Sequence, residues 1–281
     1  MINSEKKLLC TDLDGTLLNT DKIITEKTLN AIRLMIKSGH SFAFSTGRPV
    51  QSAIPLAQKY GFMDLPGFYI VSYNGALIYE CCTHKTIYTC PFERKYLRIL
   101  FDAAAANHIH CHTYDRTNVV SEHQTAMLRE YTRVIKVPPV IVDDVTEYLT
   151  VEPLKVICAD IYDRKKLERF EKLMAPSVNG HLSSVFSSDM LLEYGSVDAN
   201  KGTGLLRLCD LLGIPVMNSI AAGDQENDTA MIKAAGLGCA MANATDSLKN
   251  AAGYITHNDN DHDGIAEIIY KFILNMSSGV L

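Results

Sequence analysis

The chain starts with a charged N-terminus and a short apolar run that leads to two acidic residues one position apart. Leu8, Leu9 and Cys10 indicate a buried strand, and Asp12 and Asp14 lie at its end. Apolar residues at helical spacing in 24–40 then predict an amphipathic helix, and "SFAFSTGR" predicts a second buried strand that ends in a polar turn. A buried strand, a helix and another buried strand indicate a βαβ unit in a parallel sheet.

The pattern changes twice along the chain. "GFYIVSYNGALIY" predicts a third strand with a tight turn at Asn74 and Gly75, and after about residue 84 amphipathic helices at 91–107 and 163–175 mix with short strands. From about Met190 strands and helices alternate again, with helices expected at 200–212, 226–235, 245–252 and 264–275. Because neither flank alone supplies a complete sheet, the sequence predicts an α/β fold with one discontinuous core domain. Residues 1–83 and 190–281 are expected to form a doubly wound, mostly parallel, Rossmann-like core sheet, and 84–189 an inserted α+β cap domain.

Composition limits the classes of binding partner to expect and indicates nothing about the oligomeric state. The 281 residues are 47% hydrophobic with a net charge of −5, and the basic residues are scattered rather than clustered. This argues against a nucleic-acid or anionic-membrane partner and favours a small molecule. No apolar run is long enough for a membrane span, the first seven residues are too polar for a signal peptide, and the eight cysteines show no C-x-x-C spacing. We therefore expect a cytoplasmic protein with reduced, mostly structural thiols.

Polar residues gather where three of the predicted strands end. In open α/β sheets, ligands bind in the crevice outside the carboxyl ends of the strands. A separate stretch, "ANKGTGLL", places Lys201 at a helix start, where exposed backbone N–H groups favour an anion. The strand-end residues are Asp12 and Asp14, then Ser45, Thr46 and Arg48, and later Gly223, Asp224, Asn227 and Asp228.

These side chains suit phosphoryl transfer with a hard metal ion. Asp12, Asp224 and Asp228 offer the oxygen ligands that Mg²⁺ prefers. A carboxylate beside such an ion can attack phosphorus, and a second carboxylate two residues away can protonate the leaving oxygen and then deprotonate the attacking water. Gly15 lets the turn approach closely, and its N–H, with Thr46 and Lys201, can neutralise charge on the transferred oxygens.

Four short motifs carry a resemblance to a known family. "DLDGT", "STGR", "NKG" and "GDQEND" occur in the order of the four motifs of the haloacid dehalogenase-like phosphatase superfamily. "SYNGA", "GDQENDTAMIKAAGLGCAMANA" and "DHDGIAEII" resemble its Cof-type subgroup, whose type IIB cap is inserted between the third strand and the lysine motif. The resemblance covers roughly 1–83 and 185–281 and is weak in the cap.

The resemblance implies a role for each matching residue. Asp12 is expected to be the nucleophile, and Asp14 the general acid/base and a metal ligand through its backbone carbonyl. Asp224 is expected to bind Mg²⁺ directly, and Asp228 directly or through a neighbouring group. Together with the strand-end pattern, this gives a predicted substrate- and phosphate-binding set of Gly15, Thr46, Gly47, Arg48, Asn74, Lys201 and Asn227, and a metal-binding set of Asp12, Asp14, Asp224 and Asp228.

The resulting prediction is a Mg²⁺-dependent phosphatase for a small phosphorylated metabolite such as a sugar phosphate, a nucleotide or a phosphorylated cofactor, with a cap that closes over the site. Two alternatives remain open. A phosphomutase uses the same core, and a phospho-accepting signalling domain also clusters Asp, Thr and Lys on a doubly wound sheet. Such signalling domains lack the second acid and the inserted domain, which favours the enzyme.

Three features depart from the family pattern or suggest other metals. Residues 242–244 read Ala-Asn-Ala where many relatives have Gly-Asn-Ala, and the loop "HNDNDHDG" is unusually acidic. Asp259, Asp261 and Asp263 match a calcium loop at its first positions, but Tyr270 stands where a bidentate Glu is needed, so we expect a polar loop and helix cap. "HIHCH" at 108–112 lacks a second ligand pair at zinc-finger spacing, which favours a strand over a zinc site.

Overall fold

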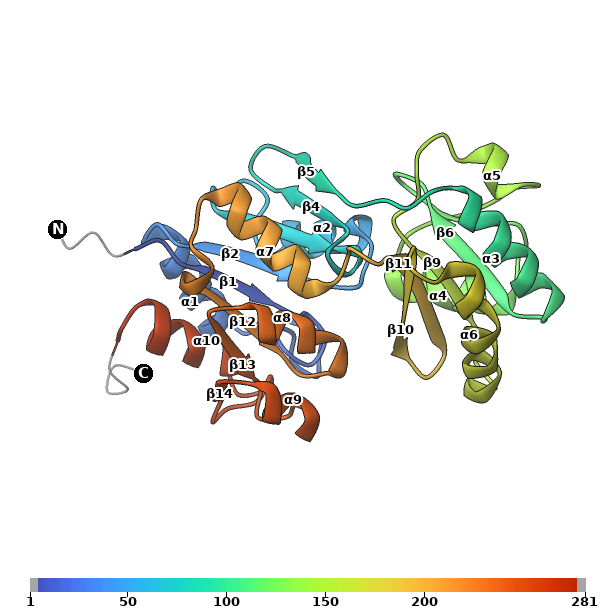
Figure 1. Ribbon diagram of the computed structural model, residues 1–281. Helices are drawn as coiled ribbons and strands as arrows, with labels where there is room; N and C mark the ends of the chain where they lie inside the picture. Colours follow the sequence, from blue (N-terminus) through green and yellow to red (C-terminus); the bar gives the residue numbers. More distant parts are fainter. Residues whose placement is uncertain (1–4, 277–281) are drawn as a thin grey trace. The chain divides into compact units, whose positions relative to one another are not determined.

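The computed structural model describes residues 5–276 and divides the chain into two compact units (Figure 1). One unit comprises Met1–Tyr88 and Asn200–Leu281, and the other comprises Thr89–Ala199. These limits differ from the expected 84–189 because of two strands. β5 (Lys85–Thr89) lies at the edge of the first unit's sheet, and β11 (Leu191–Ser196) pairs with strands of the second unit.

An eight-stranded sheet forms the centre of the first unit, in the order β14-β13-β12-β1-β2-β3-β4-β5. The strands from β14 to β3 run parallel, and β4 is antiparallel to β3. The predicted fold class, a mostly parallel α/β sheet, is therefore confirmed. The remaining strands are β1 (Leu8–Thr11), β2 (Ser41–Ser45), β3 (Phe68–Ser72), β4 (Leu77–Glu80), β12 (Ser219–Gly223), β13 (Leu237–Ala240) and β14 (Tyr254–Ile255).

Helices cover both faces of this sheet. The chain moves from β1 to β3 in one direction along the sheet and from β12 to β14 in the other, so right-handed crossovers place the connecting helices on opposite faces. Accordingly α1 contacts α10 and α7 contacts α8, as Figure 1 shows. The helices are α1 (Glu26–Lys37), α2 (Val50–Lys59), α7 (Lys201–Leu212), α8 (Thr229–Ala234), α9 (Asp246–Ala251) and α10 (Gly264–Ile268), which continues as a π-helical turn to Ile273.

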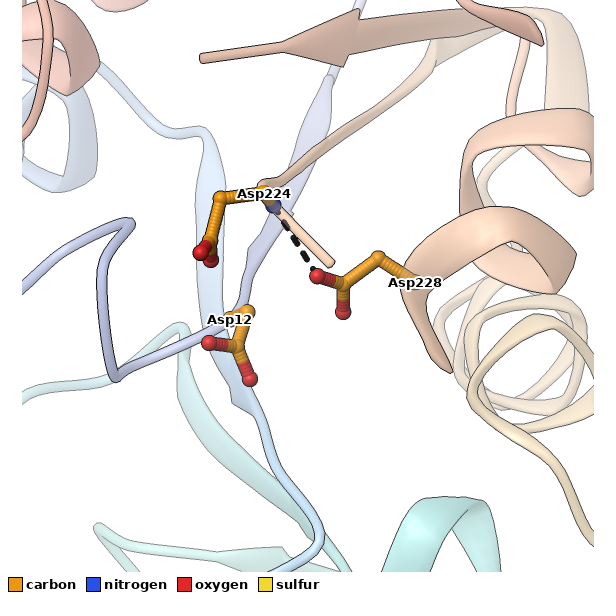
Figure 2. Close-up of side chains that lie close together, drawn as sticks. All are labelled: Asp12, Asp224 and Asp228. Carbon is orange, nitrogen blue, oxygen red and sulfur yellow. Dashed lines mark hydrogen bonds between the residues drawn. The ribbon is translucent and has the colours of Figure 1, made fainter. Parts of the chain in front are cut away.

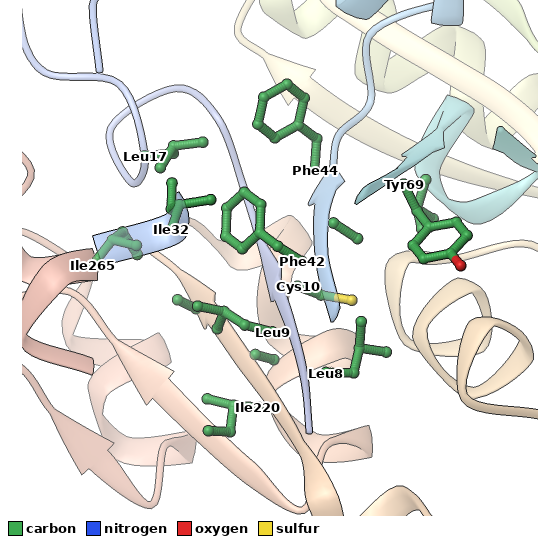
Figure 3. Packing of buried hydrophobic residues seen from close by; sticks show 14 of the residues in the cluster. Leu8, Leu9, Cys10, Leu17, Ile32, Phe42, Phe44, Tyr69, Ile220 and Ile265 are labelled. Carbon is green, nitrogen blue, oxygen red and sulfur yellow. The ribbon is translucent and has the colours of Figure 1, made fainter. Parts of the chain in front are cut away.

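Alternation along the strands separates a hydrophobic face from the face that carries the acids. Leu9 of β1 lies opposite Phe42 of β2, and both are fully buried against α1 and α10 (Figure 3). Burial of each such side chain is worth about 1.5–3 kcal/mol. Leu8 and Cys10 point to the other face, and since side chains alternate with a period of two, Asp12 follows on that face, where α7 packs.

The β3–β4 hairpin fixes the start of α7. The predicted tight turn is confirmed: a short 3₁₀ segment, Tyr73–Gly75, joins the strands, and Asn74 has a left-handed backbone with φ 54°. A Cβ on Gly75 would lie 2.1 Å from the carbonyl oxygen of Asn200, the residue that caps α7. Helix and turn therefore meet through backbone atoms, which only glycine permits.

The second unit has a six-stranded sheet in the order β10-β11-β9-β6-β7-β8, antiparallel except for the β7–β8 pair. Two of its helices match the predicted ones, whereas α4 was not predicted. Within residues 5–276 the structure has no helix that is long and apolar enough to cross a membrane. The elements are α3 (Lys95–Ala106), β6 (His110–Tyr114), β7 (Val119–Ser121), α4 (Ala126–Ile135), β8 (Pro139–Ile141), α5 (Val145–Tyr148), β9 (Val156–Ala159), α6 (Arg164–Val178) and β10 (Leu182–Ser188).

Candidate active site

Three aspartates meet at the carboxyl ends of β1 and β12. Asp12 directly follows β1 and Asp224 directly follows β12, and these strands pair in parallel register. Asp228 ends the short 3₁₀ segment Glu226–Asp228 that follows. One oxygen from each carboxylate lies within 4.8 Å of the others, and the residues are at most 9% exposed (Figure 2). The sequence-predicted strand-end acids are thus brought together from segments more than 200 residues apart.

Lys201 supplies the one buried cation in contact with this cluster among the described residues. It is the first residue of α7, it is 1% exposed, and its Nζ donates hydrogen bonds of 2.6 Å to Asp12 Oδ1 and to Asp228 Oδ1. Burial would lower the pKa of Lys201, but the two carboxylates raise it above its usual value, so the ammonium stays charged. Three carboxylates and one ammonium sum to −2 when all are ionised, which favours a divalent cation.

The buried, charged surroundings shift the pKa of Asp12 strongly. Burial raises the pKa of Asp12 to about 7; the Lys201 ammonium opposes this shift and the Asp228 carboxylate adds to it. In the described part of the chain, Lys201 is the only side chain that donates to the Asp12 carboxylate, and it does so at Oδ1. Oδ2 is therefore available to a ligand or to a reacting group.

Asp228 and Asp224 are held by different donors. Asp228 Oδ2 accepts from the backbone N–H groups of Asp224 (3.0 Å) and Gln225 (3.1 Å), as Figure 2 shows for the first of these. With Lys201 on Oδ1, Asp228 has fewer open lone pairs than its neighbours. Asp224 accepts from Thr16 Oγ1 at 2.7 Å and from Gln225 Nε2 at 3.1 Å, and burial raises the pKa of Asp224 above its usual value.

Asp14 lies in a different electrostatic environment two residues after Asp12. Its carboxylate is 43% exposed and accepts hydrogen bonds from Arg48 Nε (2.9 Å) and from Lys22 Nζ (2.9 Å). Partial burial would raise the pKa of Asp14, but the two cations together hold it below its ordinary value. Arg48, which the sequence placed with the phosphate-binding residues, is thus an ion-pair partner of Asp14 in this structure.

Three of the predicted phosphate-binding residues, Thr46, Gly47 and Asn74, lie in contact with one another. The backbone N–H of Asn74 donates to the carbonyl of Thr46, and a Cβ on Gly47 would lie 2.8 Å from Asn74 Oδ1. The Thr46 N–H is already bonded to the carbonyl of Val71, and its Oγ1 accepts from the Arg48 N–H at 3.1 Å. The Thr46 hydroxyl can still donate its proton to an anion.

Gly15 and Asn227 complete the predicted set. Gly15 has φ +84°, and a Cβ there would lie 2.5 Å from Asp224 Oδ2, so any side chain would collide with the cluster. Asn227 is half-buried and directly precedes Asp228. Sequence reasoning did not assign two further contacts, the Thr16 bond to Asp224 and a bond from Asn243 Nδ2 to the Gly15 carbonyl (2.8 Å). The "DGT" motif pointed to Thr16, whereas nothing local identifies the partner of Asn243.

The two alternative metal sites have other structural roles. His110 Nε2 and His112 Nδ1 lie 3.0 Å apart and bond to each other, and no third ligand joins them among residues 5–276. In the acidic loop, Asp261 bonds to Thr20, and Asp263 stands at the cap position of α10 with its carboxylate bonded to α1. The expected strand and polar loop are confirmed.

Comparison with known proteins agrees with the motifs. The model of the haloacid dehalogenase-like hydrolases matches residues 9–269. A 5-amino-6-(5-phospho-D-ribitylamino)uracil phosphatase of Bacillus subtilis is 32% identical over 272 residues, which cover 95% of this chain and 96% of that protein. A haloacid dehalogenase-like hydrolase from Bacteroides thetaiotaomicron superposes with a TM-score of 0.86 at 30% identity and covers 95% of this chain and 99% of that one. A subclass IIB sugar phosphatase gives a TM-score of 0.79 at 21% identity, with coverage of 95% and 99%, and shares the fold. The chain therefore belongs to the haloacid dehalogenase-like hydrolase family, as its motifs predicted, and is a phosphatase of that family.

Proposed function

We propose that this phosphatase hydrolyses a small phosphorylated metabolite with Mg²⁺ as its cofactor, through an aspartyl-phosphate on Asp12. One observation carries the proposal: a buried cluster of three carboxylates and one ammonium at the carboxyl ends of two parallel strands. A purely structural ion cluster would not need Asp12 Oδ2 to remain open. Cytoplasmic location is part of the same proposal, since metabolite phosphates are found there.

The donor set fits Mg²⁺. The available groups are carboxylate oxygens, with a net charge of −2 after Lys201 is counted, and no sulfur or imidazole ligand belongs to the cluster. Asp12 and Asp224 would hold the ion directly, Asp14 would contribute its backbone carbonyl, and Asp228, with both oxygens already bonded, would mainly orient Lys201 and the Asp224 loop. When bound, Mg²⁺ would neutralise charge on the phosphoryl oxygens.

Asp12 would act as the nucleophile. One of its carboxylate oxygens attacks phosphorus, the bond between phosphorus and the leaving oxygen breaks, and an acyl phosphate forms on Asp12. Lys201 holds the carboxylate in place and stabilises its ionised form, which is the reactive form. Thr46 and Asn227 lie at the neighbouring strand ends and would donate to the transferred phosphoryl group, together with the Gly15 N–H.

Asp14 would move the protons. In the first step it donates a proton to the leaving oxygen, and in the second it takes a proton from the water that attacks the acyl phosphate and releases inorganic phosphate. To be protonated it must lose part of its pairing with Arg48 and Lys22, because these cations favour the ionised form. A phosphate dianion in the site would compete for both cations and supply that change.

The substrate class follows from the site and from one relative. The site offers groups for a phosphoryl group, and the Bacillus subtilis relative is named as a phosphatase of a phosphorylated ribitylamino-uracil. We therefore include sugar phosphates, nucleotides and phosphorylated cofactor precursors in the proposal. A panel of such metabolites, assayed for released inorganic phosphate, would identify the preferred one.

The test of the mechanism uses p-nitrophenyl phosphate. Wild-type protein should release p-nitrophenol with Mg²⁺ and lose turnover in EDTA, and Asp12→Asn should be inactive because an amide cannot form the acyl phosphate. Turnover that survives EDTA, or an active Asp12→Asn variant, would refute the proposal. An isomerised sugar phosphate without net phosphate release would identify a phosphomutase instead, and a long-lived phospho-Asp12 without turnover would identify a phospho-accepting domain.

A further inference from the structure

A second loop contacts the turn that carries Asp14. This loop comprises residues 256–263, follows β14, and contains the acidic stretch that does not bind a metal in the proposed mechanism. We call it the supporting loop. Its contacts join residues more than 200 positions apart within the first unit.

Two asparagines connect the supporting loop with the turn. Asn260 Nδ2 donates to the carbonyl of Leu18 at 3.0 Å, and its backbone N–H donates to Asn243 Oδ1 at 3.3 Å. Asn243 Nδ2 in turn donates to the carbonyl of Gly15 at 2.8 Å. The amide of Asn243 thus links the supporting loop to the residue that directly follows Asp14.

Two acids extend these contacts along the chain. Asp261 accepts from the backbone N–H and from Oγ1 of Thr20, both at 2.7 Å. Asp263 Oδ1 accepts from the hydroxyls of Thr25 and Thr28, at the start of α1. Each of these carboxylates is bonded to donors of the segment that follows β1, which explains the acidity of the loop without a bound ion.

The supporting loop is itself held in one conformation. Asp259 Oδ1 accepts from the backbone N–H groups of Asp261 and His262, both at 3.0 Å, and the Gly264 N–H donates to the Asp259 carbonyl. Asp263 has a left-handed backbone with φ 65°. A loop closed by such bonds can fix the position of what it contacts.

The contacts leave Asp14 itself free to change partners. The Leu18 N–H donates to the Leu13 carbonyl at 2.8 Å and closes the turn, so Asp14 lies between two fixed ends. Gly15 and Leu18 are held through their carbonyls. Among residues 5–276, the Asp14 carboxylate bonds only to side chains from outside the supporting loop. A fixed backbone holds a general acid/base at the distance and angle that proton transfer requires.

We propose that Asn243, Asn260 and Asp261 are positioning residues that fix the backbone of the Asp14 turn, so that the Asp14 carboxyl reaches the leaving oxygen. The inference rests on the proposed function of Asp14. It predicts that loss of these contacts slows the step that needs proton donation and leaves the phosphoryl-binding groups in place.

The kinetic test compares two substrates of similar shape. Phenyl phosphate has a much poorer leaving group than p-nitrophenyl phosphate, so it depends more on proton donation. Asn260→Ala and Asp261→Ala should lower kcat and kcat/KM for phenyl phosphate by about three- to tenfold, with its KM nearly unchanged. They should lower kcat/KM for p-nitrophenyl phosphate less. Asp261→Asn keeps an oxygen acceptor for the Thr20 N–H and should recover most of the rate.

A structural readout and a matched control accompany the kinetics. In hydrogen exchange, peptides covering residues 14–20 should exchange faster in Asp261→Ala and Asn260→Ala than in wild type. Asn218→Ala removes a comparable side-chain bond, from Nδ2 to Glu5 Oε2 at 3.0 Å, and should change neither readout. Both residues precede strands, β12 and β1, whose opposite ends carry the site.

The outcomes separate the two proposals. Unchanged exchange in residues 14–20, or equal loss of kcat/KM for both substrates, would overturn the positioning role even if Asp12→Asn is inactive. An active Asp12→Asn variant would overturn the proposed function, and the exchange data would still decide whether the supporting loop holds the turn.

Discussion

Removal of the Lys201 ammonium tests the electrostatic account of the site most directly. In Lys201→Met, a side chain of similar length replaces the lysine without its charge. Asp12 and Asp228 would lose a donor at 2.6 Å each and would remain buried. Truncation of one partner of a buried ion pair leaves an uncompensated charge and costs about 3–5 kcal/mol. We expect the free energy of unfolding of the first unit to fall by that amount at pH 8.

The cost should depend on pH in a stated direction. Because the pKa of Asp12 in the folded protein, about 7, lies above its unfolded value, the group's contribution to stability is present below the unfolded pKa and is lost as the pH rises through 7. Loss of Lys201 raises this pKa further. Each added unit costs about 1.4 kcal/mol while the pH lies above both the old and the new pKa, and nothing when Asp12 is protonated in both proteins. At pH 8, which is about one unit above 7, the Asp12 part of the cost therefore reaches at most about 1.4 kcal/mol. The destabilisation should therefore be smaller at pH 5.5 than at pH 8.

Urea unfolding followed by circular dichroism at the two pH values measures this difference. Arg207→Met is the matched control, because Arg207 lies on the same helix and its ion-pair partner, Asp210, is exposed. That change should cost less than about 1 kcal/mol at both pH values. A Lys201→Met cost below about 1 kcal/mol at pH 8, or one equal at both pH values, would refute the claim that Lys201 compensates buried carboxylates.

Three further predictions use other parts of the structure. Gly15→Ala combines a left-handed φ with a collision at the acid cluster, so it should lower the melting temperature. It should also reduce turnover of p-nitrophenyl phosphate about five- to 150-fold, as a loss of 1–3 kcal/mol would. Arg48→Met removes a cation that lowers the pKa of Asp14, so the limb of the pH–rate profile that disappears in Asp14→Asn should move to higher pH. Iodoacetamide with mass spectrometry should label first the two cysteines that are not buried, and the other six only after unfolding; these two are Cys82 and Cys90.

Much of the fold follows from local pattern, and the exceptions have local causes. Buried strands β1, β2 and β3 and helix α1 were predicted because their apolar periods are unbroken. Helix α2 was not, since it contains Pro55 and begins directly after the "STGR" turn. The strand Leu191–Ser196 has an apolar run that precedes a helix, as core strands do, but it pairs with β9 and β10 in the other sheet. The hydrophobic pattern of a single strand does not specify which strands it pairs with.

The site also contains features that the sequence predicts and features that it does not. The rule that ligands bind at the carboxyl ends of parallel strands predicted one site for Asp12 and Asp224, and the motif order added Lys201 from a helix start. It could not predict that Arg48 pairs with Asp14, or that Asn243 reaches the Gly15 carbonyl. Those contacts join distant segments of the chain, and Arg and Asn are common on ordinary protein surfaces. Motif order predicts the reacting groups, whereas the residues that bond to them are seen only in the three-dimensional structure.

Asp12 and Asp14 show how the environment assigns opposite properties to identical side chains. Burial raises the pKa of Asp12, and the cations beside Asp14 lower its pKa, yet the proposed reaction needs Asp12 ionised and Asp14 protonated. At neutral pH the free protein therefore holds Asp12 only partly ionised and Asp14 ionised, which is not the reactive arrangement. Positive charge brought to the acid cluster would lower the pKa of Asp12, and a phosphate that draws Arg48 and Lys22 away would raise that of Asp14. Binding of the reactants would thus set both protonation states, which restricts the chemistry to the loaded site.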